Sequence, residues 1–258
     1  MQERLDSSFN YVARASHVDL GEVVVKLGAS GIEFVSELEA LRLYGGQGAV
    51  RLLKADPMNG AMMLESVRPG SALSNVRSDE EATSIAASVM RTLWRPVPEQ
   101  HPFAAMSEFD GGVEWLRTCL ANQCSPIPTT LVSRAEGLLR ELASGQAEPV
   151  LLHGDLHHDN ILSAERGRWL AVDPKGVVGD PTYDVGPFLY NRLFETDSPV
   201  SRLKRRVDQM SEEFGFERDR IVRAAIPRAV LAAWPAGSSG EPWRDALRCA
   251  ELLAGLTT

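Results

Sequence analysis

The segment His153–Asn160 constrains this chain more than any other, because it sets a dense polar run between two apolar ones. The runs Pro149–Leu152 before it and Trp169–Val172 after it are typical of short buried strands, and Asp173 follows the second. A turn at Arg166–Gly167 is expected between the polar segment and the second strand. Polar side chains on a loop held by rigid strands are frequently functional. The pattern therefore predicts a site on this loop, completed by a carboxylate at the end of the next strand.

The first quarter of the chain has the pattern of a small antiparallel sheet with one helix. Apolar residues recur at helical spacing from Ile32 to Tyr44, and Gly45–Gly46 ends the predicted helix. Runs rich in β-branched and aromatic residues, separated by polar turns, predict four strands: Phe9–Arg14, Val23–Leu27, Ala49–Leu53 and Ala61–Glu65. A linker is expected at Val67–Gly70.

Beyond this linker the chain is predicted to be mainly helical. Ser78 followed by Glu81 is typical of a capping box at the start of a helix. Further helices are predicted around Met106–Leu120, Thr130–Leu142, Tyr183–Leu193, Val200–Phe214, Arg218–Trp234 and Trp243–Leu256. The sequence therefore predicts an α+β protein with an N-terminal domain at residues 1–67 and a helical C-terminal domain at residues 68–258.

Composition narrows the classes of partner. The formal net charge of −8 argues against nucleic acid and suits a small cationic substrate, although many other proteins share such a charge. Three cysteines without metal-ligand spacing argue against a disulfide framework. No apolar run approaches the length of a membrane span, and the first residues lack the pattern of a signal peptide. We therefore predict a cytoplasmic protein without a membrane partner, and the oligomeric state stays open.

Phosphoryl transfer is the chemistry that best uses the polar loop. It needs a carboxylate for the attacking hydroxyl, oxygen ligands for Mg²⁺ and a lysine for the phosphates. Asp155 supplies the first, and Asn160 and Asp173 supply hard oxygen donors. Lys26 lies in an early predicted strand, and Glu37, eleven residues later in the predicted helix, can pair with it.

Two other interpretations of the loop remain open at this point. His153, Asp155, His157, His158 and Asp159 together resemble a zinc-ligand cluster. However, their order differs from that of dinuclear zinc hydrolases, and no histidine follows His158 to complete such a site. The loop could instead use its polar side chains only to satisfy its own backbone.

The motifs resemble those of a known family. His153–Asn160, followed by Asp173-Pro-Lys-Gly-Val-Val-Gly-Asp180-Pro-Thr-Tyr-Asp184, looks like the aminoglycoside phosphotransferases, and most like the group of streptomycin 6-phosphotransferases and hydroxyurea-resistance kinases. Glu39–Leu53 and Leu231–Trp234 resemble that group too. The resemblance implies a bilobal, protein-kinase-like fold with ATP between the lobes.

The resemblance also implies residue roles. Asp155 corresponds to the catalytic base, and Asn160 and Asp173 correspond to the Mg²⁺ ligands. Lys26 corresponds to the phosphate-binding lysine, with Glu37 as its partner and Glu39 as the alternative. The remaining expected roles are backbone contacts to adenine from Glu65–Val67, phosphate contacts from Ser7 and Ser8, support of the loop by His153, and bracing of the loop by Asp184.

The predicted function is an ATP- and Mg²⁺-dependent kinase for a hydroxyl of a small, cationic acceptor, such as an aminoglycoside like streptomycin. The resemblance has one departure. Only Met1–Leu5 could supply the extra strand of the relatives, and the phosphate-covering turn Asp6–Asn10 has no glycine. A nucleotide-binding protein that has lost transfer is therefore an alternative. A kinase for hydroxyurea or another small metabolite is a further one.

Overall fold

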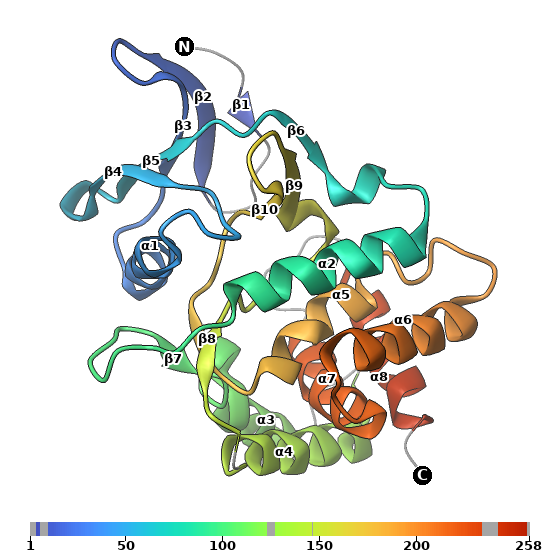
Figure 1. Ribbon diagram of the computed structural model, residues 1–258. Helices are drawn as coiled ribbons and strands as arrows, with labels where there is room; N and C mark the ends of the chain where they lie inside the picture. Colours follow the sequence, from blue (N-terminus) through green and yellow to red (C-terminus); the bar gives the residue numbers. More distant parts are fainter. Residues whose placement is uncertain (1–3, 6–9, 123–126, 146, 234–241, 257–258) are drawn as a thin grey trace.

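The computed structural model describes residues 4–5, 10–122, 127–145, 147–233 and 242–256. One end of the molecule is built from strands and the other from helices (Figure 1). The polar loop His153–Asn160 belongs to a segment that leaves the helices and runs back toward the strand-rich end (Figure 1). This arrangement brings residues that are distant in sequence to one place.

The strand-rich end is a five-stranded antiparallel sheet with the order β1-β2-β3-β5-β4. The helix α1 (Ile32–Tyr44) packs beside it and buries Phe34, Leu38 and Leu41. The strands are β1 (Arg4–Leu5), β2 (Tyr11–His17), β3 (Gly21–Leu27), β4 (Leu52–Asp56) and β5 (Ala61–Glu65). The predicted order of strand, strand, helix, strand and strand is confirmed, and β1 adds an edge strand.

One strand boundary was predicted wrongly. The expected strand Ala49–Leu53 is replaced by β4, which begins only at Leu52. Ala49 and Val50 are buried, but against β10 (Arg168–Ala171) rather than in the sheet. The Val50 amide donates to the carbonyl of Ala171 at 3.0 Å, and the Ala171 amide donates to Gly48 at 2.8 Å. The apolar run Ala49–Leu53 therefore predicted burial correctly, but the strand beside Ala49 is β10 and not a strand of the N-terminal sheet.

The expected linker Val67–Gly70 contains the start of a strand. The strand β6 (Pro69–Ala72) pairs with β9 (Ile161–Ala164), and β9 forms a hairpin with β10. A third small sheet has the order β7-β11-β8, made of Ala104–Ala105, Val177–Gly179 and Val150–Leu152. The polar loop therefore joins strands of two different sheets, and not the two arms of one hairpin.

The helical part is arranged around α7 (Arg218–Ala232), which contacts α4, α5, α6 and α8 and has most of its residues buried. The other helices are α2 (Asp79–Leu93), α3 (Gly112–Asn122), α4 (Thr129–Ala143), α5 (Gly186–Tyr190), α6 (Pro199–Phe214) and α8 (Pro242–Ala254). The predicted cap is confirmed, since the Ser78 side chain accepts a hydrogen bond from the Glu81 amide at 3.1 Å.

Two predicted helices differ from the structure. The expected helix Tyr183–Leu193 consists of a 3₁₀ turn at Pro181–Val185 followed by the short α5. The expected helix Met106–Leu120 begins only at Gly112, after another 3₁₀ turn. Both segments contain apolar residues that are buried without the backbone being α-helical throughout.

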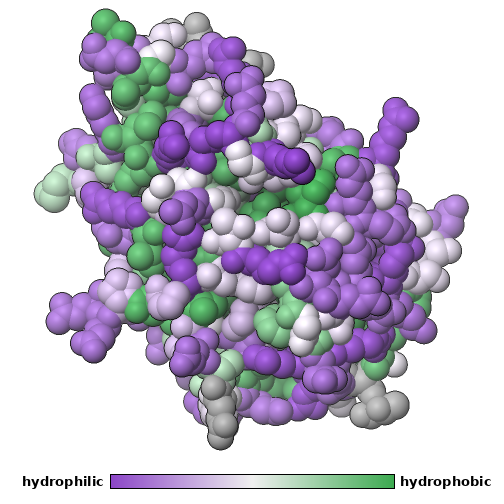
Figure 2. All heavy atoms as spheres, in the orientation of Figure 1, coloured by the Kyte–Doolittle hydropathy of each residue, from purple (hydrophilic) through white to green (hydrophobic). Residues whose placement is uncertain are grey.

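The predicted α+β class is confirmed by the antiparallel sheet and the helical remainder. Within the described ranges, no helix combines the length and the apolar character needed to cross a membrane. Hydrophilic side chains cover the visible face over α6 (Figure 2). This helix therefore turns a polar face outward while Leu203, Val207 and Met210 pack inward.

Candidate active site

The Lys26 ammonium joins three separate parts of the fold. Lys26 lies in β3 and is only 5% exposed. It donates to both carboxylate oxygens of Glu37 in α1, at 2.6 and 2.7 Å, and also to Asp173 just after β10. Glu39 pairs with Arg42 instead, so the structure distinguishes between the two partners proposed for Lys26. The sheet, its helix and the end of the β9–β10 hairpin therefore meet at one ion cluster, in which Lys26 and Glu37 are buried and Asp173 is partly exposed.

Asp173 lies between two lysines. Lys26 bonds one carboxylate oxygen, and the Lys175 ammonium bonds the other at 2.8 Å. Burial opposes the ionised form, but the two ammonium groups outweigh it and lower the pKa of Asp173 to about 2. The backbone of Asp173 is left-handed, with φ 60°, which is uncommon outside glycine and frequently marks functional positions.

The lysines and carboxylates influence one another. Burial raises the pKa of Glu37, and Asp173 adds to that rise while Lys26 opposes it. Burial would lower the pKa of Lys175, but Asp173 outweighs it and the pKa is raised. The sequence alone did not assign Lys175 to the site, although its side chain, which is 37% exposed, pairs with Asp173 there. Its position two residues after Asp173 was the signal that could have identified it.

The fully buried side chain of Asp184 supports the polar loop. Its carboxylate accepts hydrogen bonds from the amides of His153 and Gly154, at 3.0 and 2.8 Å, and from the indole of Trp94 at 3.2 Å. Gly154 has φ 85°, a conformation that glycine adopts without strain. These contacts are those expected of a residue that holds the loop in shape.

The carboxylate of Asp155 is partly open to solvent. Its side chain is 27% exposed, and its main-chain carbonyl accepts a hydrogen bond from the Asn160 amide nitrogen at 2.9 Å. Asn160 can bind a cation only through its side-chain oxygen, because the lone pair of an amide nitrogen is delocalised. The Asn160 oxygen and the Asp173 carboxylate are hard donors, so these residues fit a Mg²⁺ ion.

The three histidines of the loop have packing and hydrogen-bonding roles. His153 is buried, with Nε2 at 2.9 Å from the carbonyl of Val172 and Nδ1 accepting from the Asp155 amide. His157 Nδ1 accepts from the Asp159 amide, which caps the short 3₁₀ turn His158–Asn160. The ring of His158 stacks on Phe188, with ring centroids 4.3 Å apart. Among the described residues, no group of three His, Cys, Asp or Glu could hold a metal ion. The zinc-cluster interpretation therefore has no support in the geometry.

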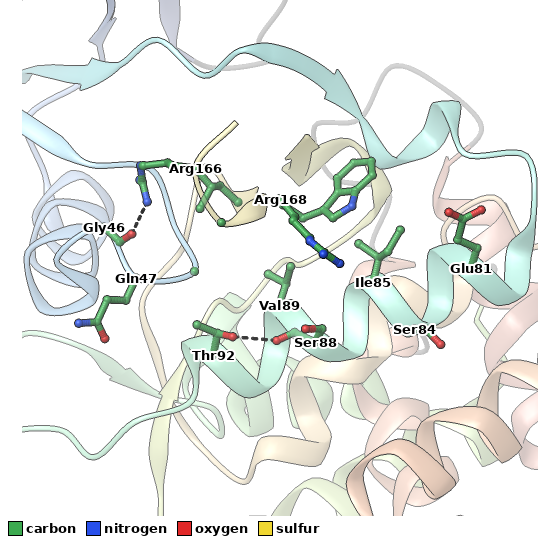
Figure 3. A pocket seen from close by; sticks show the side chains of 14 residues that line it. Gly46, Gln47, Glu81, Ser84, Ile85, Ser88, Val89, Thr92, Arg166 and Arg168 are labelled. Atoms are coloured by element: carbon green, nitrogen blue, oxygen red, sulfur yellow. Dashed lines mark hydrogen bonds between the residues drawn. The ribbon is translucent and has the colours of Figure 1, made fainter. Parts of the chain in front are cut away.

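The segment expected to contact adenine follows β5. The Glu65 carboxylate accepts from the Arg51 amide at 2.8 Å and from both Arg166 Nε, at 2.9 Å, and Arg166 Nη2. Arg166 also donates to the carbonyl of Gly46 at 2.7 Å (Figure 3). The side chain of Glu65 is therefore committed to the protein, which leaves the backbone of Glu65 and Val67 for a ligand. The adenine contacts of this segment stay a prediction.

Arg166 also lines a cavity of about 550 Å³ between α2, the turn at Gly46–Gly48 and the β9–β10 turn (Figure 3). Neither Lys26 nor Asp155 nor Asp173 lines this cavity, so it is distinct from the ion cluster. The expected phosphate contacts of Ser7 and Ser8 lie outside the described residues. Neither residue can be related to the cluster.

The sequence matches a family model for aminoglycoside/hydroxyurea antibiotic resistance kinases over residues 11–240. It is 33% identical to streptomycin 6-kinase of Streptomyces griseus over 210 residues, which cover 79% of this chain and 67% of that enzyme. It is 30% identical to hydroxyurea phosphotransferase of Kitasatospora aureofaciens over 222 residues, or 81% of this chain and 60% of that enzyme. The chain thus spans about two thirds of the length of the relatives that it matches.

Solved structures support the fold. The choline kinase LicA from Streptococcus pneumoniae superposes with a TM-score of 0.69 and 17% identity, covering 98% of this chain and 92% of that one. A thermostable mutant of aminoglycoside phosphotransferase APH(4)-Ia superposes with a TM-score of 0.67 and 14% identity, covering 98% and 94%. At these identities the likeness concerns the protein-kinase-like fold alone. The sequence match assigns the family, and the chain belongs to the aminoglycoside/hydroxyurea antibiotic resistance kinases.

Proposed function

We propose that this protein is an ATP- and Mg²⁺-dependent kinase that transfers the γ-phosphate to a hydroxyl of a small acceptor. The observation that carries the proposal is the cluster of Lys26, Glu37 and Asp173, which joins β3, α1 and the segment just after β10. Placing these charged groups out of water costs solvation energy that their mutual attraction has to offset. The Lys26 ammonium suits a polyanion, and the Asp173 carboxylate suits a cation bound together with it.

Each residue of the site has a distinct proposed task. Lys26, held by Glu37, binds the phosphates, and the backbone of Glu65 and Val67 receives the base. Asn160 and Asp173 hold Mg²⁺, which when bound offsets the charge of the phosphates. The proposed contribution of Ser7 and Ser8 to phosphate binding is kept as part of the same hypothesis.

Asp155 is the proposed catalytic base. Its carboxylate orients the acceptor hydroxyl and accepts the proton as the oxygen attacks phosphorus. The bond between the γ-phosphorus and the bridging oxygen breaks, and ADP leaves with the bonding electrons. The partial exposure of Asp155 supports this task, because an acceptor must reach the carboxylate from solvent.

We propose an aminoglycoside such as streptomycin as the acceptor, because two relatives at 33% and 31% identity are streptomycin 6-kinases. The net charge of −8 suits a cationic acceptor. Hydroxyurea is the alternative acceptor, since another relative is a hydroxyurea phosphotransferase. We further propose a cytoplasmic location and a division into domains at residues 1–67 and 68–258, with the site between them.

The test is transfer of label from γ-labelled ATP to streptomycin, other aminoglycosides and hydroxyurea, with and without Mg²⁺. We expect labelled streptomycin only when Mg²⁺ is present. Labelled hydroxyurea alone would replace the proposed acceptor. Binding of ATP without transfer to any acceptor would contradict the proposed activity and favour a nucleotide-binding protein of the same fold.

A further inference from the structure

Arg228, a residue of the helical part, contacts the proposed catalytic base Asp155. It lies in α7, and its side chain is only 5% exposed. Its Nη2 donates to the carbonyl of Gly154 at 3.1 Å and lies 3.4 Å from Oδ1 of Asp155. A single guanidinium therefore contacts both the backbone and the carboxylate of the loop, 73 residues away in sequence.

The Arg228 side chain is confined by its surroundings. Its guanidinium lies over the ring of Phe109, 5.6 Å from the centroid. Its stem packs so closely on Gly186 that a Cβ there would lie 2.8 Å from Arg228 Cγ. Any larger residue at position 186 would displace the stem. These contacts hold the guanidinium in one orientation, in which Nη2 lies 3.4 Å from Asp155 Oδ1.

Arg206 offers a comparison within the same molecule. It is also buried, and it pairs with Asp79 at 2.6 Å while its Nη1 donates to the carbonyls of Phe188, Leu189 and Asn191. Its carboxylate partner is itself mostly buried, as expected of an ion pair that joins helices. Arg228 instead contacts Asp155, whose side chain is 27% exposed and can be reached by a substrate.

The contact between Arg228 and Asp155 Oδ1 places the two carboxylate oxygens of Asp155 in different surroundings. Arg228 Nη2 contacts Oδ1 at 3.4 Å, while Oδ2 lies 3.9 Å from His157 Nε2. A base must lie within hydrogen-bond reach of the proton that it accepts, and a misplacement of about 1 Å can cost about 100-fold in rate. Fixing Oδ1 therefore fixes the direction in which Oδ2 faces an acceptor hydroxyl.

We propose that Arg228 is a positioning residue for phosphoryl transfer, which orients the Asp155 carboxylate so that Oδ2 receives the acceptor proton. The inference rests on the proposed function, because it assigns the task to the same base. It makes Arg228 act through Asp155 and not on the nucleotide. It also gives α7, which carries no motif of the site, a direct connection to the reaction.

The test is a double-mutant cycle of Arg228→Ala and Asp155→Ala, with transfer from γ-labelled ATP to streptomycin as the readout. We expect Arg228→Ala alone to lower kcat about 100-fold while the KM for ATP stays near the wild-type value. In the Asp155→Ala background the same substitution should cost little more, because residues that act as a unit are not additive. Added guanidinium ion should restore part of the kcat of Arg228→Ala, and ammonium ion should not.

Arg220→Ala is the matched control, since Arg220 lies in the same helix and pairs with Asp180 at 2.8 Å without contacting the loop. We expect it to keep the wild-type kcat. If Arg228→Ala does not fold, Arg228→Lys carries the same cycle, because lysine keeps the charge and loses the planar fork.

Losses that add fully in the cycle, or a wild-type kcat in Arg228→Ala, would overturn the positioning role and leave the proposed function standing. A wild-type protein that transfers phosphate to no acceptor would overturn both. The two failures are therefore distinguishable in one set of measurements.

Discussion

Replacing Glu37 with Gln tests whether the buried ion pair orients Lys26 for a nucleotide. Glu37 accepts two hydrogen bonds from the Lys26 ammonium, at 2.6 and 2.7 Å, and both side chains are buried. Gln keeps the size of the side chain and one acceptor oxygen but removes the charge. Lys26 then keeps only Asp173 as a charged partner, so it is drawn toward that carboxylate and away from a phosphate.

The expected magnitude follows from the lost charge. A hydrogen bond to a charged group contributes about 1.5–3 kcal/mol. We therefore expect Glu37→Gln to raise the Kd for MgATP about 10- to 100-fold. The fall in the free energy of unfolding should stay below the roughly 3–5 kcal/mol of a broken buried pair, because Asp173 still neutralises Lys26.

Calorimetric titration with MgATP and urea unfolding measure the two quantities. Glu39→Gln is the control, since Glu39 lies two residues further along α1, is 35% exposed and pairs with Arg42. It should change the free energy of unfolding by less than about 0.5 kcal/mol and leave the Kd unchanged. Wild-type affinity in Glu37→Gln, or equal losses in both variants, would refute the role of the pair.

Three further substitutions probe the charges around the loop. The folded-state pKa of Asp173 is about 2 against an ordinary 3.8, so its carboxylate stabilises the fold above about pH 4 and this contribution is lost toward pH 2. The shift corresponds to about 2 kcal/mol of unfolding free energy at most. We expect about 1 kcal/mol, because the Asp173 side chain is 35% exposed. Urea unfolding of Asp173→Asn as a function of pH measures this contribution. Burial, aided by Arg206, lowers the pKa of His158 to about 3. As the pH falls, His158 is therefore protonated in the unfolded chain before it is protonated in the folded one. The free energy of unfolding should fall by about 2 kcal/mol between pH 7 and pH 5 for this reason. His158→Gln should remove this part of the pH dependence in urea unfolding, and an unchanged slope would contradict the assignment. Asp184→Asn should cost about 1–3 kcal/mol of unfolding free energy, because its NH₂ group cannot accept from the Gly154 amide, and should lower kcat more than it weakens MgATP binding in calorimetry.

The parts of the site that could be predicted from sequence are those whose local pattern carries information. Lys26 stands in a β-branched run and Glu37 in a helical one, so their elements were identified before their contact was known. The apolar run before His153 predicted a buried strand, and the apolar run before Asp173 predicted the strand that ends beside it. In each case the residue type and its element agreed.

The parts that could not be predicted depend on contacts between distant segments. Arg228 stands in a helix whose pattern predicts only burial, and nothing near it indicates the loop that it contacts. The pairing of β6 with β9 joins segments about 90 residues apart, and residues 67–70 looked like a linker because a proline and a glycine interrupt them. Ala49–Val50 shows the same limit, since burial was evident and the partner was not.

The most direct test of the proposed function is a single-turnover measurement of phosphate transfer to streptomycin by Asp155→Ala. Its affinity for MgATP, measured by calorimetry on the same preparation, shows whether the nucleotide site is intact. We predict that the rate falls about 10²- to 10⁴-fold, the usual scale for the loss of a general base, while the Kd for MgATP stays at the wild-type value. Transfer at the wild-type rate would contradict the assignment of Asp155 and with it the mechanism proposed for this site.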